Sequence, residues 1–417
     1  MKRVICKISV LMAIVFIAMS CTKKEPKYNG IYKVRIPLED GQGQYRFTTV
    51  ELRSVSDIQS MTGSVANLKY GGKVSHEVEN LKAKDWGIID TKISGQNTPS
   101  AHFATVGDVL IPTDYTSLLL STVMYHTEGT KTFYDGFNAN DKLEFPYAVI
   151  VDPEHIFTDK RFETYPITNN AAYISMLDLF VYHPYKRDEL PLGFNGGIVA
   201  HEYFHRIFHA KTNFVMTQLA DRTAELTPDP QDITDLTPEQ LAKVNVLLAS
   251  ALNEGLADYF AYEYSKNPAW MLPSAKKNLS RDVQVKKNVA GNKKQQLKDI
   301  VDHNLNEDSP RRRLEQHEIG SIYASFFYRL SNIWGAEKTK IAILNFLPRF
   351  AENFTKNRKT DFMSMGETIS VFFNDEKLSP DVCSEVLSVF GDELTIQNFK
   401  PCKGFEINPP RMVNRGE

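Results

Sequence analysis

Two histidines and a glutamate in the pattern His-Glu-x-x-His, at His201, Glu202 and His205, are the residues of this chain best suited to chemistry. An α-helix turns once every 3.6 residues, so His201 and His205 lie on one helix face, one turn apart. Two imidazoles placed in this way can hold one Zn²⁺, each at roughly 2.0–2.1 Å. Glu202 then points beside the metal, where it can take a proton from water. The pattern therefore predicts a zinc site with a general base next to it.

A reactive zinc site needs a third protein ligand and an open fourth position. The stretch 253–260 supplies a carboxylate at Glu254 and a second one, Asp258, one turn later on the same helix face. A zinc-bound histidine commonly donates its other ring N–H to a carboxylate of this kind. The alternative is that the two histidines are ordinary surface residues of a helix, and the second acidic stretch argues against it.

Together the two stretches resemble the gluzincin zinc peptidases, and within them the thermolysin-like family. That family carries His-Glu-x-x-His on one helix and Asn-Glu-x-x-x-Asp on the next. The resemblance implies that His201, His205 and Glu254 are the zinc ligands and that Glu202 is the general base. It also implies that Asp258 is the partner of His201 and that Asn253 supports the ligands from behind.

The sequence departs from the thermolysin-like pattern at two points. Arg206 stands where such helices usually carry an uncharged residue, and the gap from His205 to Glu254 is longer than usual. The metzincin pattern does not fit, because its glycine and third histidine would fall on Phe208 and Lys211. The thermolysin-like pattern therefore fits this sequence better than the metzincin pattern does.

Three further segments bear on the site. The stretch 317–328 resembles the thermolysin-like segment whose histidine stabilises the oxyanion of the transition state, which implies that role for His317, with Tyr323 as a second candidate donor. The alternative for His317 is a surface histidine at a helix entry. His209 drifts off the ligand face and is expected beside the ligands or at the surface. Residues 170–173 resemble the Asn-Ala edge strand that pairs with substrate, an ordinary core strand being the alternative.

The elements that must position these residues indicate a mixed α+β fold. The resemblance implies a zincin-like metallopeptidase with a β-containing upper lobe, an active-site helix and a mainly helical C-terminal lobe. Residues 31–109 alternate strand-like pieces with Gly and Ser turns. We expect them to form a small β-rich region, either an accessory module or the outer layer of a peptidase domain at 110–417. A polar insertion is expected at about 212–236, followed by a capped helix start at Thr237.

The N-terminus indicates export. Residues 1–20 join a basic start to an apolar run that is too short to span a membrane, as in a signal peptide. The small residues before Cys21 resemble a bacterial lipobox, which implies cleavage, lipidation of Cys21, a tether over 21–30 and anchoring in the cell envelope. Thr22 resembles the next residue of lipoproteins bound for the outer membrane. Plain signal cleavage and an uncleaved anchor are the alternatives.

The remaining cysteines and the net charge bear on the compartment and the partners of the protein. Cys383 and Cys402 are expected to form a disulfide in an oxidising compartment, two unpaired thiols being the alternative. A formal net charge of −2 gives no nucleic-acid footprint. We therefore expect a zinc-dependent endopeptidase of the bacterial envelope, which acts on peptide or protein substrates, contacts the membrane through its lipid and has no nucleic-acid partner. The alternative is a catalytically inactive zincin-fold lipoprotein that binds a partner.

The lipobox can be tested on the native protein. The mature chain, extracted from bacterial membranes, is expected to enter the detergent phase and to begin at Cys21 with acyl mass attached. Mass spectrometry of the N-terminal peptide measures this mass, and Cys21→Ser is the control that should lack it. A water-soluble mature protein with an unmodified Cys21 would contradict the lipoprotein assignment.

Overall fold

The structure is a computed structural model that describes most of the chain. The described residues are 30–40, 44–78, 88–159, 163–186, 190–213, 236–275, 281–289, 316–374, 376–391, 393–394 and 399–404. The predicted export segment with Cys21, and most of the predicted insertion at 212–236, lie outside these residues.

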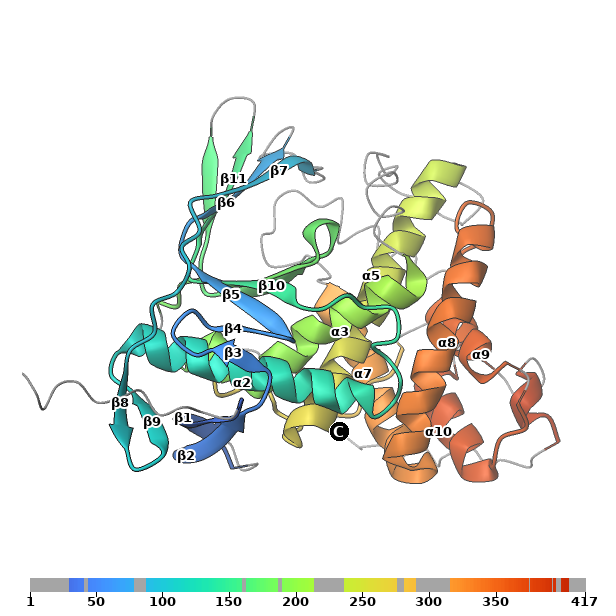
Figure 1. Ribbon diagram of the computed structural model, residues 1–417. Coiled ribbons are helices and arrows are strands. Elements are labelled where there is room, and N and C mark those ends of the chain that lie inside the picture. Colours follow the sequence, from blue (N-terminus) through green and yellow to red (C-terminus); the bar gives the residue numbers. More distant parts are fainter. Residues whose placement is uncertain are drawn as a thin grey trace, which may run out of the picture.

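The described strands form three sheets, which lie to the left in Figure 1. Their bounds are β1 Tyr32–Glu39, β2 Tyr45–Leu52, β3 Val55–Asp57, β4 Thr62–Gly63, β5 Ala66–Tyr70, β6 Lys73–Val78, β7 Ile88–Ser94, β8 Phe103–Val106, β9 Val109–Pro112, β10 Tyr147–Val151, β11 Glu154–Asp159, β12 Thr164–Ile167, β13 Ala171–Ile174 and β14 Leu179–Tyr182. The strand orders are β2-β1-β9-β8, β13-β14-β10-β5-β4-β3 and β12-β11-β6-β7.

Strands from before and after residue 110 share two of these sheets. β5 pairs in parallel with β10, and β6 pairs in parallel with β11. The β-rich region at 31–109 is therefore built into the same sheets as the chain that follows it.

Helices make up the rest of the described core. Their bounds are α2 Tyr115–Asp135, α3 Gly196–Thr212, α5 Pro238–Ser265, α7 Gln316–Trp334, α8 Ala336–Asn357, α9 Met365–Phe373 and α10 Pro380–Phe390. In Figure 1, α2 runs below the six-stranded sheet, α3, α5 and α7 lie in the middle, and α8 to α10 lie on the right. The mixed α+β fold predicted from the sequence is confirmed. Cys383 on α10 and Cys402 form a disulfide.

The two central helices begin where local sequence signals place them. The hydroxyl of Thr237 accepts a hydrogen bond from the N–H of Gln240 at 3.3 Å, and the Gln240 side chain accepts from the N–H of Thr237 at 2.9 Å. This confirms the predicted capping box of α5. At the start of α3, the Asn195 side chain accepts from the N–H of Gly197 at 3.0 Å and donates to the Trp270 carbonyl at 2.9 Å. Both helix starts are thus fixed by side chains.

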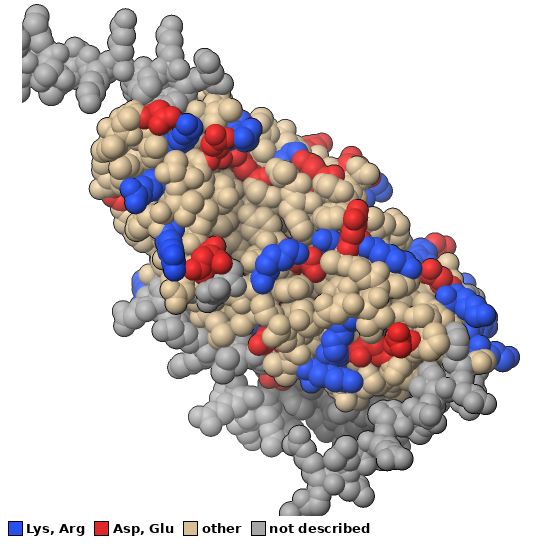
Figure 2. All heavy atoms as spheres, turned by 90° about the horizontal axis from the view of Figure 1, so that it is seen from below, with Lys and Arg blue, Asp and Glu red and all other residues tan. Residues whose placement is uncertain are grey.

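The surface carries charges of both signs. Figure 2 shows Lys and Arg side chains lying among Asp and Glu side chains over the face seen from below. Among the described residues, no helix is both long enough and apolar enough to cross a membrane.

Three buried histidines lie in the strands next to the junction of two sheets. His76 on β6 and His155 on β11 have ring centres 4.8 Å apart, and His155 stacks on His183, just after β14, at 4.7 Å. His183 Nδ1 donates to the carbonyl of Asn170 at 2.6 Å, and His155 Nδ1 is hydrogen-bonded to His183 Nε2. Burial lowers the pKa of His76 to about 4, of His155 to about 3 and of His183 to about 4.

The lowered pKa values of these three histidines predict that the free energy of unfolding falls in acid. An unfolded histidine has a pKa of about 6.5, so between that value and the folded values the unfolded chain binds more protons. Each histidine therefore contributes stability that is complete above pH 6.5 and is lost toward pH 4, at up to about 1.4 kcal/mol per pH unit. Denaturant unfolding at a series of pH values measures this slope.

The matched variants separate this cluster from other acid effects. His155→Phe should make the slope of unfolding free energy between pH 4 and pH 6.5 shallower. His102→Phe is the control, because the His102 side chain is 67% exposed and lies outside this cluster, and it should change the slope less than His155→Phe does. Equal slopes in His155→Phe and wild type would contradict the assignment.

Candidate metal centre

Two imidazoles and one carboxylate converge where α3 packs against α5. His201 Nε2 and His205 Nε2 lie 3.0 Å apart. Glu254 Oε2 lies 3.2 Å from His201 Nε2 and 3.7 Å from His205 Nε2. One ligand atom from each of the three residues lies within 4.8 Å of the other two, so the group can hold a metal ion. The structure thus brings together the three ligands that the sequence predicts.

The two imidazoles are oriented by acceptors behind them. His201 Nδ1 lies 3.1 Å from Asp258 Oδ1, and His205 Nδ1 lies 3.0 Å from Asn253 Oδ1. An amide or carboxylate oxygen can only accept, so each Nδ1 donates a proton. The Nε2 atoms of both rings then face the cluster, which is the orientation that a metal ligand requires.

The chemistry of these donors fits a cation. Glu254 Oε2 is buried and makes no well-aligned hydrogen bond within the described part of the chain, although three imidazole nitrogens surround it and Arg281 Nη2 lies 3.6 Å away. Burial alone would raise the pKa of Glu254, but His317 and His205 lower it well below its usual value. Burial and Arg281 act to lower the pKa of His201, and Asp258 and Glu254 raise it to about 9. The carboxylate is thus held ionised in a buried site, where an opposite charge stabilises it most.

Glu202 lies beside the cluster and is not one of its members. The residue is 8% exposed, and its Oε2 accepts a hydrogen bond from the backbone N–H of Tyr173 at 2.9 Å. Tyr173 belongs to β13, which stands at the edge of the six-stranded sheet. Residues 170–173 therefore lead into an edge strand next to the site, as their resemblance implies. The N–H of Tyr173 fixes one carboxylate oxygen and leaves Oε1 for other contacts.

His317 reaches the cluster from the first turn of α7. His317 Nε2 lies 3.3 Å from Glu254 Oε2, and the His317 side chain is 34% exposed, against 10% for Glu254. Gln316 donates to Glu254 Oε1 at 3.1 Å. His317 thus lies next to a ligand and on the more exposed side of the cluster.

A pair of glycines lets α7 come this close. A Cβ on Gly255 would lie 2.1 Å from the carbonyl oxygen of Gly320, and a Cβ on Gly320 would lie 2.6 Å from the carbonyl oxygen of Ala251. Neither contact can be relieved by turning a side chain, because both oxygens belong to the backbone. The missing side chain at Gly255 thus allows α7 to pack directly behind Glu254.

Tyr323, the second candidate donor, lies away from the cluster. Its side chain is 1% exposed, its hydroxyl interacts with Thr368 on α9, and its ring packs near Phe390. Tyr323 follows His317 by six residues, which on a helix leaves the two side chains about 120° apart. The face of α7 that presents His317 therefore cannot also present Tyr323.

Arg281 is a site residue that the sequence did not predict. Its Nε donates to both oxygens of Asp258, at 3.2 and 3.1 Å, and its Nη2 lies 3.3 Å from His201 Nε2. The guanidinium also lies over the ring of Trp270, which stacks on His201. Asp258 thus holds an imidazole and a guanidinium together. A buried Asp258 implies a cation nearby, but 49 Lys and Arg residues give no means of choosing it.

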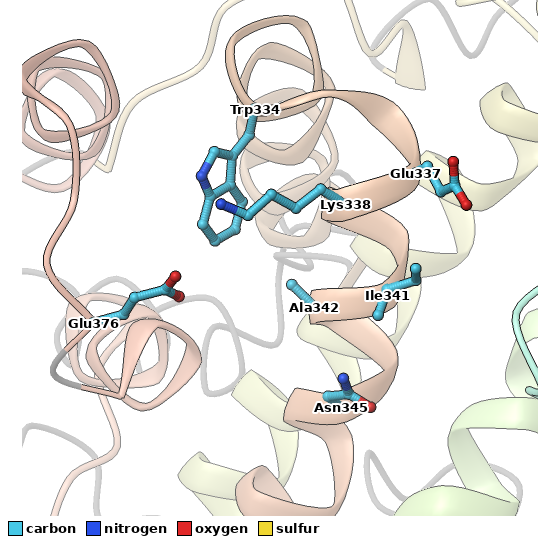
Figure 3. A pocket seen from close by; sticks show the side chains of 7 residues that line it. All are labelled: Trp334, Glu337, Lys338, Ile341, Ala342, Asn345 and Glu376. Atoms are coloured by element: carbon cyan, nitrogen blue, oxygen red, sulfur yellow. The ribbon is translucent and has the colours of Figure 1, made fainter.

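His209 lies outside the cluster. Its ring centre is 6.4 Å from that of Tyr173, and its side chain is half-buried. An open hollow of about 460 Å³ beside α8 lies elsewhere and shares no lining residue with the cluster (Figure 3). Trp334, Lys338 and Glu376 are among the side chains that line it.

Comparisons with known proteins add little to this geometry. No protein-family model matches the chain, and no curated protein matches it. Among solved structures, the precursor of protealysin, a metalloproteinase from Serratia proteamaculans, is similar with a TM-score of 0.38 and 12% sequence identity. The match covers 77% of this chain and 86% of that chain. A likeness at this level carries no weight for function, so the assignment rests on the side chains.

Removing Glu254 tests the ligand set. Glu254→Ala is expected to lose zinc almost completely, because two imidazoles remain where a zinc site needs three protein ligands. His209→Ala is the matched control, because His209 is on the same helix as His201 and outside the cluster, and it should keep one zinc per chain. Elemental analysis after dialysis measures the zinc content. One zinc in Glu254→Ala together with none in His209→Ala would show that the ligands are misassigned.

Proposed function

We propose that this protein is a zinc-dependent endopeptidase of the gluzincin type, anchored by lipid in the bacterial cell envelope. The observation that carries the proposal is the joint placement of His201, His205 and Glu254 as a ligand group with Glu202 held beside it. A metal site that only stabilised the fold would not require Glu202. The enzyme is therefore favoured over an inactive zincin-fold protein that binds a partner.

Zinc suits the donors of this site. Two imidazoles and one carboxylate are the ligand set of zinc peptidases that keep a fourth position open. His201 Nε2, His205 Nε2 and a carboxylate oxygen of Glu254 would hold the ion. When bound, zinc polarises the scissile carbonyl and acidifies the attacking water.

Glu202 serves as the general base. The Tyr173 N–H holds Oε2 at 2.9 Å, so Oε1 takes the proton from the attacking water. The same carboxyl group then passes the proton to the leaving nitrogen, which must be protonated for the peptide bond to break. Because the Tyr173 N–H fixes the carboxylate, little reorientation is needed between the two transfers.

His317 and the edge strand act on the substrate. His317 Nε2, next to Glu254 and partly exposed, donates to the oxyanion that develops on the scissile carbonyl. In a strand, successive backbone groups face opposite sides, so Ala171 presents its N–H and C=O to the same side as Tyr173. An extended peptide can pair with that edge beside Glu202, by adding a strand to the sheet. The substrate class is therefore an extended polypeptide segment.

Glu202→Gln tests this mechanism. The amide keeps the shape of the side chain but cannot accept a proton, so peptide hydrolysis should fall by about 10² or more. Zinc content and thermal stability should stay near wild type, because Glu202 is not a ligand. Glu318→Gln is the matched control, because Glu318 is exposed and adjoins His317 in the chain, and it should keep full activity.

Both measurements are made on the same zinc-loaded preparations, with a library of peptides as substrate. Equal hydrolysis by wild type and Glu202→Gln, with contaminating protease excluded, would falsify the general-base role. An absence of hydrolysis in wild type, with one zinc per chain, would favour the partner-binding alternative.

A further inference from the structure

Arg206 is a buried cation on α3, one residue after the ligand His205. Its side chain is 1% exposed. Burying a charge is expensive unless the charge is paired and hydrogen-bonded. At the sequence level Arg206 was only a departure from the thermolysin-like pattern, and nothing in the proposed chemistry uses it.

The guanidinium of Arg206 is paired with Asp178 in a two-pronged arrangement. Nε donates to Asp178 Oδ1 at 2.6 Å, and Nη2 donates to Oδ2 at 2.5 Å. Nη2 also donates to the carbonyl of Glu144 at 2.7 Å, and the guanidinium lies 4.5 Å from the ring centre of Tyr147. Bidentate pairs of this kind fix direction as well as distance. Asp178 is thus held in one place relative to α3.

Asp178 belongs to the connection between β13 and β14. It follows the short turn Ser175–Leu177 with a left-handed backbone conformation, φ 46°. Its Oδ1 accepts a hydrogen bond from the hydroxyl of Tyr173 at 3.0 Å. The Arg206 pair therefore reaches the edge strand itself, through the side chain of the residue whose backbone N–H binds Glu202.

Tyr173 is consequently tied to α3 at two points. Its N–H binds Glu202, and its hydroxyl binds Asp178, which binds Arg206. Glu202 and Arg206 are four residues apart, so they lie on the same helix face one turn apart. One face of α3 thus fixes both the position and the orientation of β13 beside the metal cluster.

Packing alone does not explain why the guanidinium of Arg206 is buried against the half-exposed Asp178. A well-packed apolar pair of similar volume is often as stabilising as a buried ion pair, or more so. Nη1 of Arg206 also has no hydrogen-bond partner within the described ranges, which adds to the cost of burial. What the pair supplies and an apolar contact does not is a fixed direction between β13 and α3.

We propose that Arg206 and Asp178 form a clamp that positions β13 against Glu202, so that the substrate-pairing edge and the general base keep one geometry. Arg206 is then a positioning residue for extended peptide substrates. The proposal rests on the proposed function for its effect on catalysis, whereas its effect on β13 does not depend on activity.

The test uses the zinc-loaded full chain with three changes. Arg206→Met removes the charge and keeps much of the volume, and Asp178, whose side chain is 46% exposed, can then turn to water. Tyr173→Phe removes only the hydroxyl link. Lys211→Met is the matched control, because Lys211 pairs from the same helix with Asp141 at 2.7 Å without involving β13.

Hydrogen exchange of the segment 171–174 is measured first, because it needs no activity. Exchange should be about 10-fold faster or more in Arg206→Met, moderately faster in Tyr173→Phe and unchanged in Lys211→Met. The second measurement is kcat/KM for a long peptide and for a blocked dipeptide that is too short to pair along β13. The ratio of the two values should fall about 10-fold or more in Arg206→Met, since only the long peptide uses the edge. Arg206→Lys should restore part of the ratio.

The possible outcomes distinguish a loss of the clamp from a general loss of folding and from a failure of the proposed function. A partly unfolded variant lowers both kcat/KM values by one factor and leaves their ratio unchanged. Unchanged exchange and an unchanged ratio in Arg206→Met and Tyr173→Phe overturn the clamp. If wild type cleaves neither peptide, the proposed function fails, and the exchange rates alone decide whether the clamp exists.

Discussion

The site depends on one constraint, which is that an ionised carboxylate from α5 is buried against two imidazoles from α3. Glu254 Oε2 lies within 3.7 Å of both His201 Nε2 and His205 Nε2. A buried carboxylate is costly unless a positive charge or a metal ion meets it. The two imidazoles that face this carboxylate are held in place by further contacts. Asn253 accepts from His205 Nδ1, and Asp258, which also binds Arg281, accepts from His201 Nδ1.

The remaining elements bring reactive groups to that crossing. Close contact of the Gly255 and Gly320 backbones allows α7 to place His317 next to Glu254. On the other side, β13 offers a backbone N–H to Glu202. Different interactions position the two elements. Close packing between backbones positions α7, whereas hydrogen bonds and an ion pair position β13. The site is thus assembled from three directions around one helix, α3.

Sequence patterns predicted what local periodicity determines. The four-residue spacing of His201 and His205, and the Glu254–Asp258 spacing, placed each pair on one helix face, and the capping box fixed the start of α5. Contacts between distant segments were not accessible. No sequence motif marks Arg281 as a site residue. No motif marks Asp178 as the partner of Arg206 either, because the two are 28 residues apart and Asp178 lies on a turn. The six-residue offset of Tyr323 from His317 places the two side chains on different faces of a helix, and this much is evident from the sequence.

The central claim is that His201, His205 and Glu254 bind one zinc ion through their inward-facing atoms. Anomalous diffraction at the zinc edge from zinc-loaded crystals tests it most directly. The account predicts a single strong peak at roughly 2.0–2.2 Å from His201 Nε2, His205 Nε2 and a carboxylate oxygen of Glu254. Asp258 should remain on His201 Nδ1. A peak bound through Nδ1, a peak without Glu254, or zinc only at another location, such as the His155–His183 pair, would contradict the account.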